Sequence, residues 1–236
     1  MRAYPVTHVG LVRPQNEDAL RVVKGLCNLY ILADGMGGHL AGEVASQMTC
    51  DVLEEELRDC AVPVASRLQH AIEQANAMVF KKQMTSPDLH GMGTTLTVLW
   101  EGDDHVLIGQ VGDSRAYLIR DGKLRQMTED HSMVNELLRS GAITEEQARV
   151  HPYRNVITRA VGTDEALQPD VLQFLKMRGD IWLLCSDGLT DMVTDEEIAA
   201  TLRDYAPAQA AERLLSLALA SGGKDNVSIM LLEVDA

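Results

Sequence analysis

Short runs of apolar and β-branched residues, each bounded by polar or turn-forming residues, recur along the chain and predict β-strands. They cover residues 29–33, 94–100, 106–111, 116–120, 181–185 and 227–234. The dipeptide Asp121-Gly122 comes directly after one of these runs. Because both central residues of a type I′ turn need positive φ, this dipeptide predicts a hairpin, and hence a sheet that is antiparallel at least in part.

Apolar residues at helical spacing predict longer elements between the strands. They occupy residues 41–57, residues 63–79 and residues 207–221. The first two of these segments are long and adjacent, so we expect them to pack as an antiparallel pair. A further short helix is predicted to begin at the capping box formed by Thr194 and Glu197.

The segment from about residue 130 to residue 152 is less apolar than its surroundings. It contains a helix-like stretch at residues 133–139 and a second capping box, formed by Thr144 and Gln147. We therefore expect a surface subdomain inserted between elements of the sheet.

Composition indicates a folded protein, with 46% hydrophobic and 24% charged residues among 236, a length suited to a single domain over residues 1–236. With 21 Lys and Arg against 35 Asp and Glu, the net charge of −14 would repel nucleic acid and anionic membranes. The four cysteines form no CxxC pair and are expected to be reduced. No signal sequence or membrane-spanning run is seen, so we expect a cytoplasmic protein without membrane insertion, and a monomer.

Four aspartates lie at the ends of predicted strands, and each has turn-forming neighbours. Asp34, Asp113 and Asp187 follow a strand, whereas Asp225 directly precedes one. In an antiparallel sheet the end of one strand lies beside the start of the next, so these acids can meet at one edge and hold hard divalent cations. Any one Asp-Gly pair could be turn chemistry alone. Four such junctions together favour a cation site.

Several other chemistries are excluded because their motifs are missing. The glycine-rich run 35–39 has Leu40 where a dinucleotide fingerprint needs glycine, and no phosphate-binding P-loop is present. No cysteine is followed at the sixth position by arginine, and no DxDxT stretch occurs, so neither a thiolate nor an aspartyl nucleophile is visible. A carboxylate cluster points instead to hydroxide generated on a metal, with a second ion about 4 Å away.

Six motifs together resemble the bacterial branch of the type-2C, metal-dependent protein phosphatases, the PPM family. They occur in that family's order over about residues 8–234. They are Arg13 with Asn16-Glu17-Asp18, the DGMGGH run 34–39, Gly93-Thr94-Thr95, Gly112-Asp113-Ser114-Arg115, Ser186-Asp187-Gly188-Leu189 and Lys224-Asp225-Asn226.

The resemblance implies an α+β fold: a four-layer αββα sandwich of two mainly antiparallel sheets, flanked by helix pairs, with a flap at about residues 130–152. It also implies two Mn²⁺ or Mg²⁺ ions. Asp34 would bridge them, the Gly35 carbonyl would bind one, and Asp187 and Asp225 would bind the other. Asp113, with Asp187, would hold a weaker third ion.

Three further residues receive roles from the resemblance, each with a plainer alternative. Arg13 would bind the substrate phosphate through its planar donor fork, or be an ordinary exposed arginine. Asp18 would orient metal-bound water, or be a turn or cap residue. His39 would protonate the leaving group or shape substrate choice, or line the rim of the site. In animal members of the family a histidine follows the Asp-Gly directly, and here Met36 holds that position.

The implied activity is hydrolysis of phosphoserine and phosphothreonine in phosphoproteins by a hydroxide bridging two metals, without a phosphoenzyme. The implied partner is a bacterial serine/threonine kinase whose targets the phosphatase would reverse, and the flap would bias substrate choice and third-metal binding. A non-catalytic regulatory module with the same fold is the main rival, but the metal aspartates and Arg13 are all present. A calcium-binding structural domain would need an EF-hand loop, which the sequence lacks.

Overall fold

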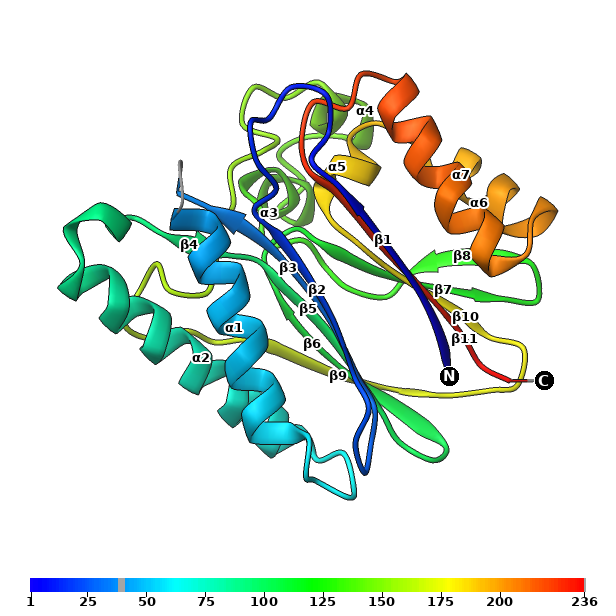
Figure 1. Ribbon diagram of the computed structural model, residues 1–236. Coiled ribbons are helices and arrows are strands. Elements are labelled where there is room, and N and C mark those ends of the chain that lie inside the picture. The colour runs from blue at the N-terminus through cyan, green and yellow to red at the C-terminus, as the bar shows by residue number, and fades with distance from the viewer. Residues whose placement is uncertain (38–40, 236) are drawn as a thin grey trace.

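Two antiparallel sheets face each other in the computed structural model, which describes residues 1–37 and 41–235 except the side chain of Arg149 (Figure 1). The first sheet contains, in spatial order, β1 (Arg2–His8), β11 (Val227–Glu233), β10 (Ile181–Cys185), β7 (Arg115–Arg120) and β8 (Lys123–Gln126). The second sheet contains β2 (Asp18–Val23), β3 (Leu29–Met36), β5 (Leu96–Glu101), β6 (His105–Val111) and β9 (Asp170–Leu175), and β4 (Gly93–Thr94) pairs with β3.

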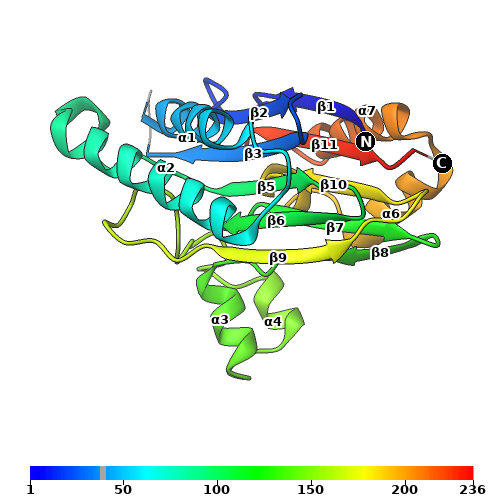
Figure 2. The ribbon, with the colours of Figure 1, turned by 90° about the horizontal axis from the view of Figure 1, so that it is seen from below.

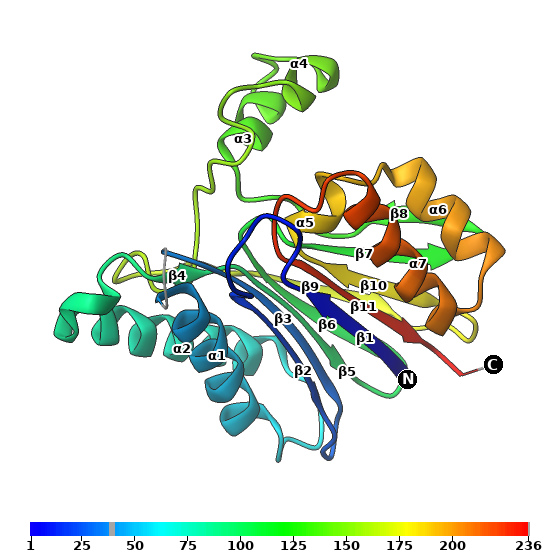
Figure 3. The same ribbon diagram turned by 45° about the horizontal axis from the view of Figure 1, so that its top comes forward.

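Helices cover the outer face of each sheet. The second sheet is covered by α1 (Ala41–Leu57) and α2 (Ala65–Thr85), and the first by α6 (Asp195–Asp204) and α7 (Pro207–Ala220). Short elements are η1 (Pro87–Leu89) and α5 (Asp187–Thr190), while α3 (Met133–Arg139) and α4 (Glu145–Arg149) project away from the sheets (Figures 2 and 3). The predicted α+β sandwich is therefore confirmed.

Three hydrophobic clusters separate the four layers. One lies between the sheets and includes Tyr30, Leu99 and Trp182. A second packs α1 and α2 on the second sheet, and a third packs α5, α6 and α7 on the first. Because the central strands are buried on both faces, they appear in the sequence as continuous apolar runs and not as alternating ones.

Local sequence signals were reliable. The φ values of 52° at Asp121 and 72° at Gly122 confirm the type I′ hairpin between β7 and β8. Both capping boxes, at Thr144 and at Thr194, are formed. Helix α1 has its predicted bounds.

Three strands were not predicted: β1, β2 and β9. Both β1 and β9 are edge strands with half-exposed residues, so their sequences lack a long apolar run. Pro5 in β1 is tolerated because an edge strand has a backbone side that needs no partner. Pairing with a central neighbour, and not their own composition, makes these segments strands.

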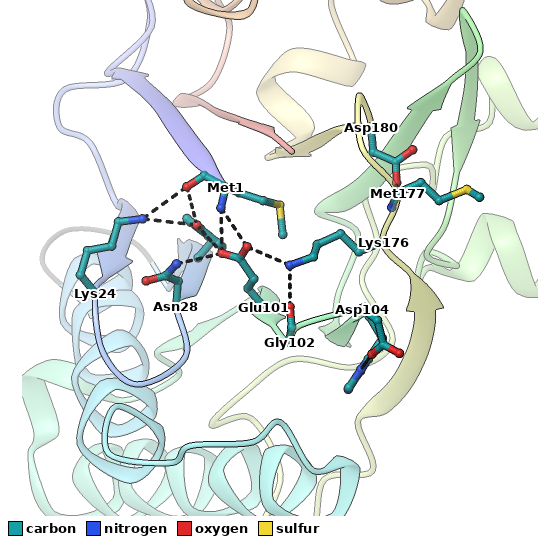
Figure 4. Close-up of polar contacts among 11 residues, drawn as sticks. Met1, Lys24, Asn28, Glu101, Gly102, Asp104, Lys176, Met177 and Asp180 are labelled. Atoms are coloured by element: carbon teal, nitrogen blue, oxygen red, sulfur yellow. Dashed lines mark hydrogen bonds and ion pairs between the residues drawn. The ribbon is translucent and has the colours of Figure 1, made fainter. Parts of the chain in front are cut away.

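A partly buried ionic network fixes the start of the chain against the second sheet (Figure 4). The Met1 amine lies 2.8 Å from Glu101 Oε1, and Lys176 Nζ lies 3.1 Å from the same oxygen. Asn28 Nδ2 donates to Glu101 Oε2 at 2.9 Å, and the Tyr30 hydroxyl donates to it at 3.0 Å. Burial alone would raise the pKa of Glu101, but these donors together lower it to about 2.

No helix among residues 1–37 and 41–235 is both long enough and apolar enough to span a bilayer.

We predict that Glu101→Gln lowers the free energy of unfolding by about 2–3 kcal/mol at pH 7, because the variant loses a carboxylate whose pKa is depressed by folding. A carboxylate whose pKa is lowered by folding stabilises the folded state at pH values above its ordinary pKa. This stabilisation is lost as the pH falls toward 2. The gap between variant and wild type should therefore narrow below about pH 4.5. Urea unfolding at pH 7 and pH 4 measures it, with the exposed Glu55→Gln as control. An equal gap at both pH values would contradict the prediction.

Candidate functional site

Two aspartates face each other where β2 begins and β3 approaches its end. The register of this antiparallel pair places Asp18 directly opposite Asp34. Asp18 is 7% exposed. The Ser186 hydroxyl donates to Asp18 Oδ2 at 3.1 Å, which joins the second sheet to the segment after β10. A pair of carboxylates, Asp18 and Asp34, thus lies where the second sheet meets the first, a region that we call the seam of the two sheets.

Hydroxyl groups hold the backbone of Asp34 in place. Its N–H donates to Thr95 Oγ1 at 3.0 Å, and its carbonyl accepts from the Thr94 hydroxyl at 2.9 Å. Thr95 Oγ1 in turn lies 2.8 Å from Ser114 Oγ. The Gly93-Thr94-Thr95 and Asp113-Ser114 motifs therefore support Asp34 from two neighbouring segments.

The opposite side of the site comes from the first sheet. Asp187 is the first residue of α5, directly after Ser186, and Asp225 lies just before β11. The Ser228 N–H donates to Ser186 Oγ at 2.9 Å, which fixes the segment after β10 to β11. Two of the predicted aspartates are thereby carried by neighbouring strands of one sheet.

Close packing at Gly35 brings helix α1 against the end of β3. A Cβ atom added at Gly35 would lie 2.2 Å from the Gly42 carbonyl oxygen, closer than real atoms approach. Only glycine therefore fits between β3 and the first turn of α1. This contact sets the position of the backbone that follows Asp34.

The directions of the aspartate pKa shifts indicate that the predicted acids lie near one another. Burial is the main cause that raises the pKa of Asp34 well above its ordinary value, and the charges of Asp18, Asp187, Asp113 and Asp225 raise it further. The pKa of Asp187 is raised by burial and by the same kind of repulsion from Asp113 and Asp225. The charges of the other three strand-end acids of the sequence prediction, Asp113, Asp187 and Asp225, thus all raise the pKa of Asp34.

The cluster fits a divalent cation. Burial raises the pKa of Asp18 and that of Asp113 to about 6, and the positive charge of Arg115 offsets only part of the rise at Asp113. Asp18 Oδ1, Asp113 Oδ1 and Asp187 Oδ1 are buried without a hydrogen-bond partner. Oxygens left unpaired in this way are the ligands that hard cations prefer.

The carboxylates alone do not complete an ion site. In the described part of the chain, no three His, Cys, Asp or Glu side chains are grouped so that they could hold one ion by themselves. An ion here would need the carboxylates to draw closer, or additional ligands from backbone carbonyls and water. Water as a frequent ligand is characteristic of Mg²⁺.

Arg13 reaches the cluster from the loop between β1 and β2. Its Nη2 lies 2.7 Å from Asp225 Oδ2, although the arginine side chain is 51% exposed. An exposed, permanently charged donor fork at the rim of a carboxylate cluster is suited to a phosphate oxyanion. The structure therefore brings Arg13 to the predicted site.

The charges of Asp130 and Asp191 help to raise the pKa of Asp113, which links the cluster to the region of the projecting helices. A cavity of about 750 Å³ separates α3 and α4 from the α5–α6 segment, with Asp130 and Asp191 in its wall. Asp130 is held by Arg115, whose Nη2 lies 2.6 Å from Asp130 Oδ2. The projecting segment is closed at its base by a bridge between Ser132 and Ile157, so it extends beyond the predicted limit of about residue 152.

Sequence reasoning missed Asp191 and the supporting hydroxyls. Asp191 adds to the charges that raise the pKa of Asp187, and it lies one helical turn after it, a spacing that could have identified it. Thr95, Ser114 and Ser186 lie within the motifs but carried no assigned role. His39 lies outside the described residues.

Comparison with known proteins identifies the family of this chain. Residues 13–221 match the family described as protein phosphatase 2C. The serine/threonine protein phosphatase PstP of Mycobacterium tuberculosis is 42% identical over 226 residues, 95% of this chain and 43% of PstP. The chain thus spans less than half of that relative. The serine/threonine phosphatase Stp of Listeria monocytogenes is 38% identical over 237 residues, 97% of this chain and 94% of Stp.

A solved structure of the PstP catalytic domain in complex with two manganese ions has a TM-score of 0.90 and 38% identity to this chain. The match covers 100% of this chain and 98% of that domain. The resemblance carried by the sequence motifs is confirmed. The chain belongs to the protein phosphatase 2C family of serine/threonine protein phosphatases.

Proposed function

We propose that this protein hydrolyses phosphoserine and phosphothreonine in proteins with the help of two Mn²⁺ or Mg²⁺ ions. The observation that carries the proposal is the set of buried, mutually repelling aspartates with unpaired oxygens at the seam of the two sheets. Bound ions would lower the pKa of a water molecule and offset the charge of the phosphoryl group. The sequence contains neither the thiolate nor the aspartyl nucleophile motif, so the reaction would proceed by direct attack of water.

The ligand assignment follows the family resemblance, and it would need shorter distances between the carboxylates or further ligands from backbone carbonyls and water, because the described carboxylates are not grouped to hold an ion by themselves. Asp34 would bridge both ions, with the Gly35 carbonyl on one and Asp187 and Asp225 on the other. Asp113, together with Asp187, would hold a third and weaker ion. The long-range effect of all these charges on Asp34 and Asp187 supports the grouping.

Asp18 and Arg13 would complete the site. Asp18 lies opposite Asp34, and its Oδ1 is free of hydrogen bonds, so it can accept one from a water molecule and orient it. Arg13, whose Nη2 lies 2.7 Å from Asp225 Oδ2, would turn its donor fork to the substrate phosphate when cations neutralise that carboxylate. His39 stays a prediction for protonation of the leaving group or for the rim.

The biological setting is a proposal by analogy with the relatives. Phosphoproteins would be the substrates, and a serine/threonine kinase would create them. We propose that residues 1–236 act as one catalytic unit and that the flap biases substrate choice. Cytoplasmic location and a monomeric state stay predictions of the sequence.

We predict that the purified protein releases phosphate from a phosphothreonine peptide in Mn²⁺ and loses this activity in excess chelator. Asp34→Asn should lower kcat/KM at least about a hundredfold, because a bridging carboxylate is removed where charge develops in the transition state. Phosphate release measures the effect, with the exposed Asp59→Asn as matched control. Full activity in chelator would refute the proposed function.

We also predict that Asp18→Asn stabilises the metal-free protein by about 1–3 kcal/mol at pH 7, because a carboxylate whose pKa is raised by folding costs about 1.4 kcal/mol per pKa unit. A carboxylate whose pKa is raised by folding does not destabilise the folded state at pH values below its ordinary pKa of about 4. It destabilises the folded state fully at pH values above about 6. The gain over wild type should therefore shrink between pH 6 and pH 4. Unfolding in chelator measures it. A variant less stable than wild type at pH 7 would contradict the prediction.

A further inference from the structure

The loop that carries Arg13, residues 9–17, connects the last residue of β1 to the first residue of β2 and so crosses from one sheet to the other. It contains no regular secondary structure of its own. A half-exposed arginine on such a loop can reach a phosphate reproducibly only if the loop itself is fixed. The contacts that hold this loop in place therefore bear on how Arg13 would bind phosphate.

Asn226 binds both ends of this loop. Its Nδ2 donates to the Val9 carbonyl and to the Gln15 carbonyl, each at 2.9 Å. Its Oδ1 accepts from the Glu17 N–H at 2.8 Å. The side chain is 4% exposed. Both amide hydrogens and the carbonyl oxygen of one buried side chain are thus used on the backbone on either side of Arg13.

The backbone of Asn226 also holds the side chain of its neighbour Asp225, the proposed metal ligand. The Asn226 N–H donates to Asp225 Oδ1 at 2.8 Å, and Asp225 Oδ2 lies 2.7 Å from Arg13. The neighbouring turn adds a second link, because the Leu11 N–H donates to the Gly223 carbonyl at 2.7 Å. The turn before β11 is therefore bonded both to Asp225, the proposed metal ligand, and to the backbone of the loop that carries Arg13.

We infer that Asn226 is a positioning residue that sets where Arg13 meets the substrate phosphate. This inference rests on the proposed function, since it concerns the phosphate that the proposed reaction would cleave. Asparagine suits the position because aspartate lacks the two donors and glutamine is longer by one methylene. Asn226 acts through the loop and needs no contact with substrate.

A double-mutant cycle with Arg13 tests the inference. Arg13→Ala should raise both KM for a phosphothreonine peptide and the inhibition constant of inorganic phosphate about tenfold, because a charge-assisted contact is lost. Asn226→Ala should raise both about five- to tenfold. The double variant should resemble Arg13→Ala within about twofold. The Mn²⁺ concentration that gives half of maximal activity should change less than about twofold, because the N–H bonded to Asp225 belongs to the backbone.

The matched control is Asn76→Ala. Asn76 is 2% exposed and also holds a loop, because its Nδ2 donates to the Asp164 carbonyl at 3.0 Å and its Oδ1 accepts from the Gly162 N–H at 2.7 Å. Its loss should lower stability by an amount similar to that of Asn226→Ala, while its effects and those of Arg13→Ala should multiply. Independent, multiplying effects of Asn226→Ala and Arg13→Ala would overturn the inference.

Hydrogen exchange gives a readout that does not require activity. In Asn226→Ala the amides within residues 9–17, above all that of Glu17, should exchange at least about tenfold faster, while Asn76→Ala should leave them unchanged. Asn226→Ser serves if the alanine variant does not fold. An inactive wild type would defeat the proposed function, whereas unchanged exchange in an active protein would defeat only the role of Asn226.

Discussion

Repulsion among the carboxylates that meet between the two sheets is the constraint on which the proposed site depends. Asp18, Asp34, Asp113, Asp187 and Asp225 come from five separate segments, and they influence one another where the two sheets meet. Such a cluster raises the free energy of the metal-free fold, because each charge is removed from water and placed near others of the same sign. Divalent cations reverse the sign of that interaction, so the same feature that burdens the fold would bind the cofactor.

Hydrophobic burial in the rest of the sandwich offsets the destabilising effect of this acid cluster. Three hydrophobic clusters, one between the sheets and one beneath each helix pair, bury the central strands on both faces. Hydroxyl groups of Thr94, Thr95 and Ser186 then fix the backbone and side chains around the acids. Asp18 and Asp34 lie within strands, and Asp113, Asp187 and Asp225 lie next to strand ends, so the two sheets set the positions of all five acids.

The loop that crosses between the sheets brings Arg13, the proposed phosphate-binding residue, to Asp225, a proposed metal ligand. The loop over residues 9–17 and the turn before β11 are linked by Asn226 and by the contact of Arg13 with Asp225. On the other side, a cavity with Asp191 in its wall separates the flap helices from the α5–α6 segment. The proposed site thus lies between a tightly bonded loop on one side and a projecting segment on the other.

Sequence alone determined the elements whose signals are local. Helix α1, the Asp121-Gly122 hairpin and both capping boxes depend on residues a few positions apart, and all were predicted. The order of the motifs also indicated the family and the aspartates at strand ends. Only the tertiary structure decided that β1 and β9 are strands, because edge segments gain their conformation from a neighbour. It alone joined Arg13 to Asp225, 212 positions away, and gave Asn226 its partners, because strand register and not local sequence sets such contacts.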